Sequence, residues 1–405
     1  MTDLVTRADV EAARKMLAGI IRDTPLLECA PLAAKVGGPA FVKCENLQRT
    51  GSFKVRGAYN RIARLTEDER AAGIVTASAG NYAQGVALAS QLLGAKSTVF
   101  MPVGAPLPKV AATRAYGAQV EFVGITVDES LVAAKQFSHE TGATFIHPFD
   151  HPDLIAGQGT VGLEILEQYP QVRTIVMGVG GGGLIAGVSA AVRETHPDIK
   201  VVGVQAAGAA AYPLSLKAGE PTRLSSISTI ADGIAVGRPG ELAFEHVKQH
   251  VDDIVTVTDD EISQALAFAL ERAKLVVEPA GVASLAALLV DPRAFEPPVV
   301  SVLSGGNIDP MLMLRVIEHG LAAAGRFLNF TVRLPDRPGS LLRLLGFIAD
   351  AHANVVTVEQ ARQSSALHLG EADVSVSVET KGTAHSEELL GALRRAKYQV
   401  FHHGG

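Results

Sequence analysis

The sequence lacks the features that mark several specialised classes of protein. It has no tryptophan and only two cysteines in 405 residues, and Cys29 and Cys44 do not have the spacing of a zinc site. A disulfide framework is therefore not expected. Positive charge is not in excess either, since the net charge is -6, so no basic surface for nucleic acid or anionic lipid is predicted. These absences favour small-molecule partners and predict no metal.

Leader signals and membrane-spanning runs are also scarce. The first 16 residues mix acidic and basic side chains and contain no apolar core of the kind found in signal peptides. Residues 174–192 carry no charge and approach spanning length, but they contain six glycines in a strand-turn-helix pattern. The glycine pattern favours a globular fold, and the sequence predicts a cytoplasmic protein.

The composition that remains indicates an α/β protein of more than one unit. Apolar residues make up 47% of the chain, glycines number 40, and aromatic residues are few. A chain of this length exceeds one ordinary core.

Strand patterns alternate with helix patterns from residue 54 to about residue 150, and a second such series follows to about residue 303. The predicted strands are 41–48, 73–77, 97–101, 119–123, 174–177, 201–205, 254–257 and 299–303, and the main predicted helices are 8–21, 83–93, 108–116, 127–141, 259–275 and 281–289. Alternation of this kind predicts two parallel-sheet units of αβα type that face each other across a cleft, where a ligand is expected.

The pattern changes after about residue 324. Residues 327–401 read as strand, helix, strand, strand, helix and strand, an order typical of a ferredoxin-like βαββαβ domain. We therefore expect one domain over residues 1–324, with a smaller subdomain at about 45–150, and a second domain over 325–405.

Lys54 is the first candidate for chemistry. It lies between Phe53 and small residues at the start of a predicted helix, in the segment TGSFKVRGAY at residues 50–59. Desolvation in such a place lowers the pKa of an amine, and a neutral lysine amine can attack a carbonyl and form a Schiff base. A surface lysine on a helix is the simpler explanation of this segment taken alone.

A glycine-rich turn is the second candidate. Gly180, Gly181, Gly182, Gly183 and Leu184 follow a predicted strand and precede a helix, so backbone N–H groups converge there on one point, as in a phosphate site. With Gly178 the turn also fits G-x-G-x-x-G, which makes a dinucleotide site an alternative. The acidic residue expected at the end of the next strand is Gln205 here, which argues against that alternative.

Two further strand-to-helix turns carry small polar residues. Ser78, Ala79, Gly80 and Asn81 form one, whose N–H groups are suited to a carboxylate, although an ordinary helix cap would look the same. Ser304 opens the other, SGGN at 304–307, as a hydroxyl at the end of a strand beside the predicted cleft.

Together the motifs S-F-K-x-R-G-A, S-A-G-N, G-G-G-G-L and S-G-G-N, in this order, resemble the fold-type II pyridoxal phosphate enzymes of the threonine and serine dehydratase branch. The resemblance covers about residues 20–320. It implies that Lys54 forms the internal aldimine, Phe53 flanks the ring and Asn81 binds the ring 3-oxygen. It also implies a phosphate site at Gly180, Gly181, Gly182, Gly183 and Leu184, Ser304 at the pyridine nitrogen, and a substrate carboxylate at Ser78, Ala79, Gly80 and Asn81.

The implied reaction is α,β-elimination from L-threonine to give 2-oxobutanoate and ammonia, with pyridoxal 5'-phosphate as cofactor. L-serine dehydratase and serine racemase of the same family remain alternatives. Related racemases have a serine at the position of Ala79 and metal-binding carboxylates at the positions of Gln205 and Ala211, so this chain departs from them. Tyr82 stands where the family often has histidine. A non-catalytic nucleotide-binding sensor is the alternative from another class.

The C-terminal segment resembles an ACT domain through D-R-P-G-S at residues 336–340. Such domains pair and bind amino acids, which implies a homodimer or homotetramer and an allosteric effector, with isoleucine or valine the leading candidates because of a role in isoleucine biosynthesis. A pairing module without a ligand is the alternative.

Other residues are expected to have structural roles only. Glu278 precedes a helix-start proline, and five histidines are expected to face solvent or to cap helices, namely His147, His151, His196, His246 and His352.

Overall fold

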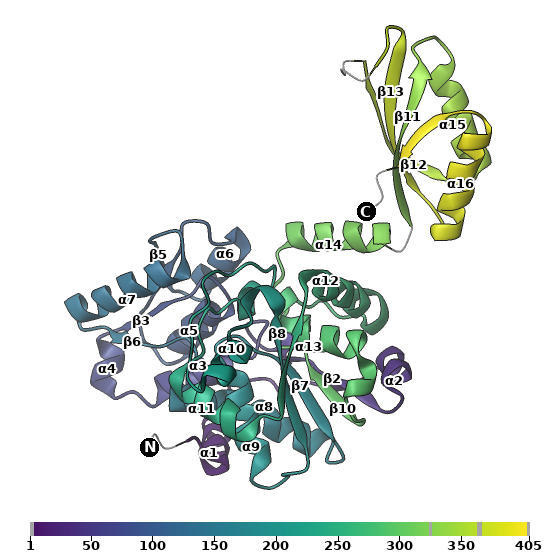
Figure 1. Cartoon of the computed structure of the whole chain (residues 1–405). Helices are drawn as coiled ribbons and strands as arrows, with labels where there is room; N and C mark the ends of the chain where they lie inside the picture. Colours follow the sequence, from purple (N-terminus) through teal and green to yellow (C-terminus); the bar gives the residue numbers. More distant parts are fainter. Residues whose placement is uncertain (1–3, 324–325, 363–366, 403–405) are drawn as a thin grey trace. The chain divides into compact units, whose positions relative to one another are not determined.

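The computed structural model describes residues 4–323, 326–362 and 367–402, and these fall into two compact units (Figure 1). The first unit ends at Asp309 and the second begins at Pro310. The domain boundary predicted between residues 324 and 325 lies outside the described residues.

The first unit contains a large sheet whose strands are nearly all parallel. In spatial order the strands are β1 (Leu26–Glu28), β2 (Ala40–Lys43), β10 (Val299–Val302), β7 (Thr174–Gly178), β8 (Lys200–Ala206) and β9 (Asp253–Val257). β1 is antiparallel to β2, and the other neighbours are parallel. The central strand β7 is buried along its whole length, as expected for a parallel sheet covered on both faces.

A smaller parallel sheet belongs to the same unit. Its strands, in spatial order, are β5 (Gln119–Phe122), β4 (Ser97–Met101), β3 (Ile74–Ala77) and β6 (Thr144–Phe145). All three pairings are parallel. The two predicted parallel-sheet units are thereby confirmed.

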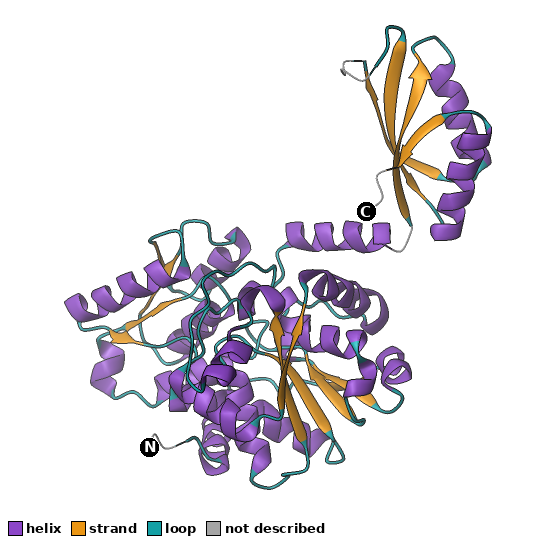
Figure 2. Ribbon diagram, in the orientation of Figure 1, coloured by secondary structure: helices purple, strands orange, loops and turns teal. Residues whose placement is uncertain are grey.

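Helices cover both sheets (Figure 2). They are α1 (Arg7–Leu17), α2 (Ala30–Val36), α3 (Lys54–Ala63), α4 (Glu67–Ala71), α5 (Asn81–Leu92), α6 (Leu107–Ala115), α7 (Val127–Thr141), α8 (Pro152–Gln168), α9 (Gly183–Arg193), α10 (Ala211–Ala218), α11 (Glu241–His250), α12 (Asp259–Phe268) and α13 (Pro279–Val290). On the large sheet, α8, α9 and α11 supply one apolar core with β7, β8 and β10, and α13 packs against β7, β8 and β10 with α12 and α2 beside it. On the small sheet, α5 and α6 share a core with β4 and β5, and α7 packs with β3 and β4.

Helix α8 is the longest of the helices that the sequence analysis did not predict, and its glycines explain the omission. It contains Gly157, Gly159 and Gly162, which disfavour a helix by propensity. In the fold these glycines let neighbouring helices approach: a Cβ on Gly157 would lie 2.7 Å from the Cα of Gly57 in α3, and one on Gly159 would lie 2.5 Å from the carbonyl oxygen of Gly187 in α9. Tertiary packing here outweighs local propensity.

A buried group of charges connects α3 to α8 and to the end of β2. Arg56, which has no exposed surface, donates to Glu45 at 2.8 Å through both Nε and Nη2, and to Glu164 of α8 at 2.5 Å through Nη1. Lys43 donates to the other Glu164 oxygen at 2.5 Å. Two cations and two carboxylates thus balance in the interior, and buried charges persist only when they are paired and hydrogen-bonded in this way.

The second unit begins with α14 (Pro310–Ala323) and continues with β11 (Phe327–Pro335), α15 (Ser340–Asp350), β12 (Asn354–Ala361), β13 (Glu371–Glu379), α16 (Thr383–Arg395) and β14 (Gln399–His402). The antiparallel sheet has the order β12, β13, β11, β14. Apolar residues of α15 and α16 form a core with one face of that sheet. The predicted βαββαβ order is confirmed.

Several predicted helix ends were too long. The first helix ends at Leu17 instead of residue 21 because Gly19 takes a left-handed backbone with φ 73°. The helix predicted to residue 275 leaves regular α geometry after Phe268.

Among the described helices, none is both long enough and apolar enough to cross a bilayer.

We predict that Arg56→Ala lowers the free energy of unfolding of the first unit by about 3–5 kcal/mol, because it leaves the carboxylates of Glu45 and Glu164 buried without their main partner. Arg14→Ala is the matched control. It breaks the exposed pair with Glu167 and should cost no more than about 1 kcal/mol. Urea titration followed by circular dichroism measures both, and equal losses would contradict the prediction.

Candidate functional site

Lys54 is the first residue of α3, and its position is fixed by the end of β10. The N–H of Phe53 donates to the Ser304 carbonyl oxygen at 3.2 Å, and Ser52 bridges to Gly305. The Lys54 amine lies 4.8 Å from the centroid of the Phe53 ring. The start of α3 is therefore held against the turn that follows β10.

The environment of Lys54 shifts its amine toward the neutral form. Burial lowers its pKa to about 8, and the nearby Glu278 carboxylate opposes that shift without cancelling it. A neutral form is thus accessible near physiological pH, as the sequence predicts for a lysine that attacks carbonyls.

The glycine turn faces the lysine across one cavity. β7 ends at Gly178 and α9 begins at Gly183, so residues 179–182 form the connection. Gly182 has φ 101°, a conformation that side chains rarely adopt, and a Cβ there would lie 1.9 Å from the Tyr212 hydroxyl oxygen. A Cβ on Gly181 would lie 2.3 Å from the Phe149 ring. Glycine is thus required here, and the N–H groups at the start of α9 can hold an anion such as phosphate.

The Tyr212 hydroxyl donates to the Gly181 carbonyl oxygen at 3.2 Å. The backbone N–H of Tyr212 donates to the side-chain oxygen of Gln205, whose nitrogen donates to the Val179 carbonyl oxygen at 3.3 Å. Gln205 therefore has a structural role beneath the glycine turn.

Among the described residues, no group of three or more histidine, cysteine or acidic side chains is arranged to hold a metal ion.

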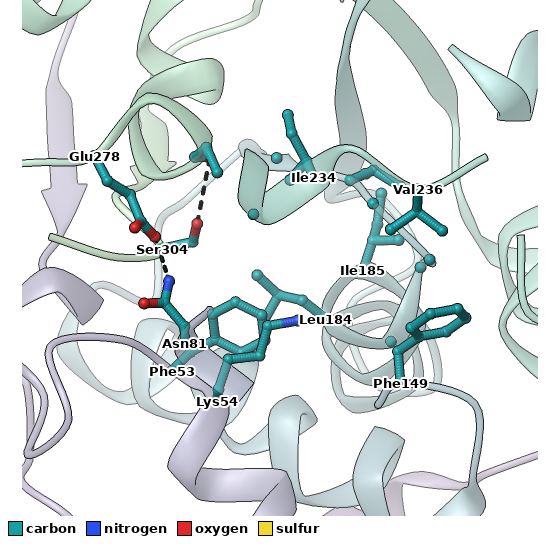
Figure 3. A pocket seen from close by; sticks show the side chains of 18 residues that line it. Phe53, Lys54, Asn81, Phe149, Leu184, Ile185, Ile234, Val236, Glu278 and Ser304 are labelled. Carbon is teal, nitrogen blue, oxygen red and sulfur yellow. Dashed lines mark hydrogen bonds between the residues drawn. The ribbon is translucent and has the colours of Figure 1, made fainter. Parts of the chain in front are cut away.

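Asn81, Glu278 and Ser304 form another wall of the cavity (Figure 3). Asn81 donates to Glu278, and Asn307 donates to the Asn81 side-chain oxygen at 2.8 Å. Ser304 is 5% exposed, and its hydroxyl lies 3.5 Å from the Ala280 carbonyl oxygen. Burial raises the pKa of Glu278 to about 7, against the opposing effect of Lys109. This wall offers a hydroxyl, an amide and a carboxyl group with little solvent around them.

The cavity, together with the open solvent at its mouth, has about 520 Å³ of space free of protein atoms. Its lining consists of Phe53, Lys54, Asn81, Phe149, Gly178, Val179, Gly180, Gly181, Gly182, Gly183, Leu184, Ile185, Gly233, Ile234, Val236, Glu278, Ala280 and Ser304. All the residues expected at a cofactor are therefore brought together. Ser78, Ala79 and Gly80 are not part of the lining and form the turn between β3 and α5 that leads to Asn81.

Sequence reasoning missed the wall formed by Glu278 and by Phe149, Ile234 and Val236. Glu278 was explained by the helix-start proline that follows it; the residue does precede α13, and it also lines the cavity. Phe149 and Val236 lie in irregular segments and Ile234 ends a three-residue helical turn, so no periodic pattern marks them.

The structure also places the other residues singled out earlier. Tyr82 is buried and its hydroxyl donates to the His147 carbonyl oxygen at 2.8 Å, so it points away from the cavity lining. His151 caps α8 as expected. The expectation for His246 was wrong, because it is fully buried and accepts a hydrogen bond from the N–H of Val5, and burial lowers its pKa to about 4.

Two family models match the chain. Residues 17–305 match the model described as pyridoxal-phosphate dependent enzyme, and residues 329–396 match the ACT domain.

The chain is 45% identical over 397 residues to an L-threonine ammonia-lyase of Thermotoga maritima, with 98% of this chain and 99% of that protein covered. It is 46% identical over 393 residues to an L-threonine ammonia-lyase of Geobacter sulfurreducens, with coverage of 96% and 98%. Among solved structures, the processed form of threonine deaminase isoform 2 from Solanum lycopersicum matches with a TM-score of 0.74 and 37% identity, covering 77% of this chain and 86% of that one. Maize serine racemase matches with a TM-score of 0.74 and 34% identity, covering 79% and 99%.

We predict that Gly182→Ala weakens the affinity for pyridoxal phosphate at least tenfold, because the new methyl group meets Tyr212 and the backbone is strained at φ 101°. Gly94→Ala is the control: Gly94 also has a positive φ of 70°, but a Cβ there meets nothing within 4 Å. Fluorescence titration of the cofactor-free protein measures both variants. Equal affinities in the two would refute the requirement for glycine at position 182.

Proposed function

Because the chain belongs to the family of pyridoxal-phosphate dependent enzymes, we propose that it is a threonine ammonia-lyase that converts L-threonine to 2-oxobutanoate and ammonia. One geometrical fact supports this activity most directly. The Lys54 amine, the glycine turn, Asn81 and Ser304 all line one cavity. The near full-length similarity to two L-threonine ammonia-lyases supports the choice of substrate.

The residues present fit pyridoxal phosphate. The turn of Gly180, Gly181, Gly182 and Gly183 leaves room that side chains would otherwise fill, and it ends at the positive end of α9, which suits a phosphate. Lys54 would hold the aldehyde carbon, Phe53 would flank the ring, and Ser304 would meet the ring nitrogen. Asn81 would donate to the ring 3-oxygen.

When bound, pyridoxal phosphate withdraws electrons from the Cα atom of an amino acid. Lys54 would have two tasks: its amine would hold the cofactor until the substrate amine replaces it, and the amine so freed would take the proton from the Cα atom of the substrate. Its lowered pKa suits the second task because the amine must be neutral to accept a proton. Loss of the β-hydroxyl with a proton, as water, and hydrolysis of the released enamine give 2-oxobutanoate and ammonia.

Ser304 would favour elimination over transamination, because a hydroxyl, unlike a carboxylate, cannot hold the ring nitrogen of the cofactor protonated. The wall around Ser304 excludes water, since Ser304 and Glu278 are 5% and 1% exposed.

The turn before α5 is our candidate for the substrate carboxylate. Ser78, Ala79, Gly80 and Asn81 lie at the N-terminus of a 12-residue helix, which favours an anion. A cation is also close, because a Cβ on Gly80 would lie 3.9 Å from the amine of Lys109, which is paired with Asp232.

We further propose that the ACT domain binds isoleucine or valine and that the chain forms a homodimer or homotetramer, in keeping with a role in isoleucine biosynthesis. The match to the ACT family over residues 329–396 supports amino-acid binding. The edge strand β12 supports pairing, since Val355 and Val356 there are 37% and 45% exposed.

The reaction is tested with purified protein and Lys54→Ala. We expect a visible cofactor band that changes on addition of threonine, with oxo acid formed only when Lys54 is present and the cofactor located on the peptide of Lys54 after borohydride treatment. Turnover of serine equal to or faster than that of threonine would replace the proposed substrate. Absence of the band after added pyridoxal phosphate would refute the activity and favour a non-catalytic nucleotide-binding sensor.

Regulation is tested by ending the chain after α14, at residue 323. The cofactor site lies entirely in the first unit, so threonine turnover should remain while the response to isoleucine or valine is lost. Initial rates with and without each amino acid measure this. A truncated protein that still responds to isoleucine would exclude the ACT domain as the effector site.

A further inference from the structure

The side-chain amide of Asn81 is held at both of its ends. Its oxygen accepts a hydrogen bond from Asn307 at 2.8 Å, and its nitrogen donates to Oε1 of Glu278 (Figure 3). A side-chain amide nitrogen has two N–H donors. The contact with Asn307 determines which end of the amide is oxygen, the contact with Glu278 uses one N–H, and a single N–H of Asn81 is left for the cavity.

Both partners of Asn81 are themselves fixed. The second N–H of Asn307 is used by the Thr50 carbonyl oxygen at 2.7 Å. The backbone N–H of Glu278 donates to the Gly305 carbonyl oxygen at 3.0 Å, and Glu278 is 1% exposed at the start of α13. Asn307 cannot turn without the loss of two partly buried hydrogen bonds, and Glu278 cannot turn without the loss of its buried bond with Asn81.

Gly305 makes this arrangement possible. A Cβ at this position would lie 2.2 Å from Oε1 of Glu278 and 3.0 Å from the side-chain nitrogen of Asn81. A side chain would therefore separate the two groups. The turn at 304–307 thus contributes a glycine that admits the contact and an asparagine that completes it, beside the serine that lines the cavity.

Glu278 is not explained by packing or stability. Its second carboxyl oxygen, Oε2, is buried and has no hydrogen-bond partner among the described residues. Burial of an unpartnered polar atom is unfavourable, so its presence in the lining of a ligand cavity calls for a role in ligand binding. The charged groups that act on Glu278 are Lys54, Lys109 and Asp232.

We propose that Glu278 and Asn307 are positioning residues that clamp the amide of Asn81, so that its remaining N–H is directed to the 3-oxygen of the cofactor ring. This inference rests on the proposed function, because it assumes pyridoxal phosphate in the cavity. A clamped donor stabilises the ionised 3-oxygen without first having to be ordered, which favours tight binding and the visible-absorbing form of the cofactor.

The test compares Glu278→Ala, Asn307→Ala and Glu278→Gln by cofactor affinity and by absorption spectrum. The alanine variants should bind pyridoxal phosphate about tenfold more weakly and transfer intensity from the visible band to the near-ultraviolet band of the neutral 3-oxygen. Glu278→Gln keeps an oxygen that can accept from Asn81 and should stay within about twofold of the wild type. If Glu278→Gln is as impaired as Glu278→Ala, the charge and not the clamp matters, and the proposal is overturned.

Non-additivity separates this role from a merely structural one. Asn307 is proposed to act through Asn81, so Asn81→Ala with Asn307→Ala should bind the cofactor no more weakly than Asn81→Ala alone. Additive losses would overturn the proposal. Should Asn307→Ala fail to fold, Asn307→Asp serves instead, since it keeps the shape of the side chain but cannot donate.

Ser284→Ala is the matched control for helix α13. It removes a buried side chain that bonds to Ser301 and to the Val302 carbonyl oxygen, away from the cavity lining, and should leave the spectrum unchanged. A spectral change in this control equal to that of Glu278→Ala would overturn the proposal. A wild-type protein without any visible band would overturn the proposed function together with this inference, whereas a normal wild-type band with unaffected variants would overturn the inference alone.

Discussion

The position of Lys54 depends on the buried ion pairs of Arg56. This guanidinium joins the segment after β2, through Glu45, to helix α8, through Glu164, and it lies two residues beyond Lys54 in the same helix. Buried charges are costly when they lose their partners, so these pairs restrict where the first turn of α3 can lie. The position of the Lys54 amine therefore follows from these ion pairs, although the amine takes part in none of them.

The site combines elements from distant parts of the chain because parallel strands end at one edge of a sheet. The turns after β7 and β10 lie at that edge of the large sheet, and the turn after β3 of the small sheet brings Asn81 to meet them. Ligands of α/β proteins bind at such edges because backbone donors and helix N-termini collect there. Each motif contributes part of the cavity lining, and none of them forms a site alone.

The sequence predicted the parts of the site that have local signatures. Lys54, the glycine turn and Ser304 each follow a strand pattern and precede a helix pattern, so their meeting in one cavity followed from the fold class. Glu278 and Phe149 were not predicted, since their contacts join residues far apart in the chain and no local pattern reports such contacts. Helix α8 was missed because its glycines are explained only by the helices that press against them. His246 was misjudged for the same reason, as its partner Val5 is 241 residues away.

The close contacts of α8 also have a consequence for how such a chain can diverge. At Gly157 and Gly159 the neighbouring backbones fill the volume that a side chain would occupy, so no change in the neighbouring side chains can make room for a larger residue. Most core positions can drift when a neighbour shrinks to compensate. Gly157 and Gly159 cannot change in this way. Related chains should therefore keep both glycines, while the apolar residues around them are exchanged freely. The absence of a side chain at these two positions is thus a more durable feature of the fold than the identity of the apolar residues around them.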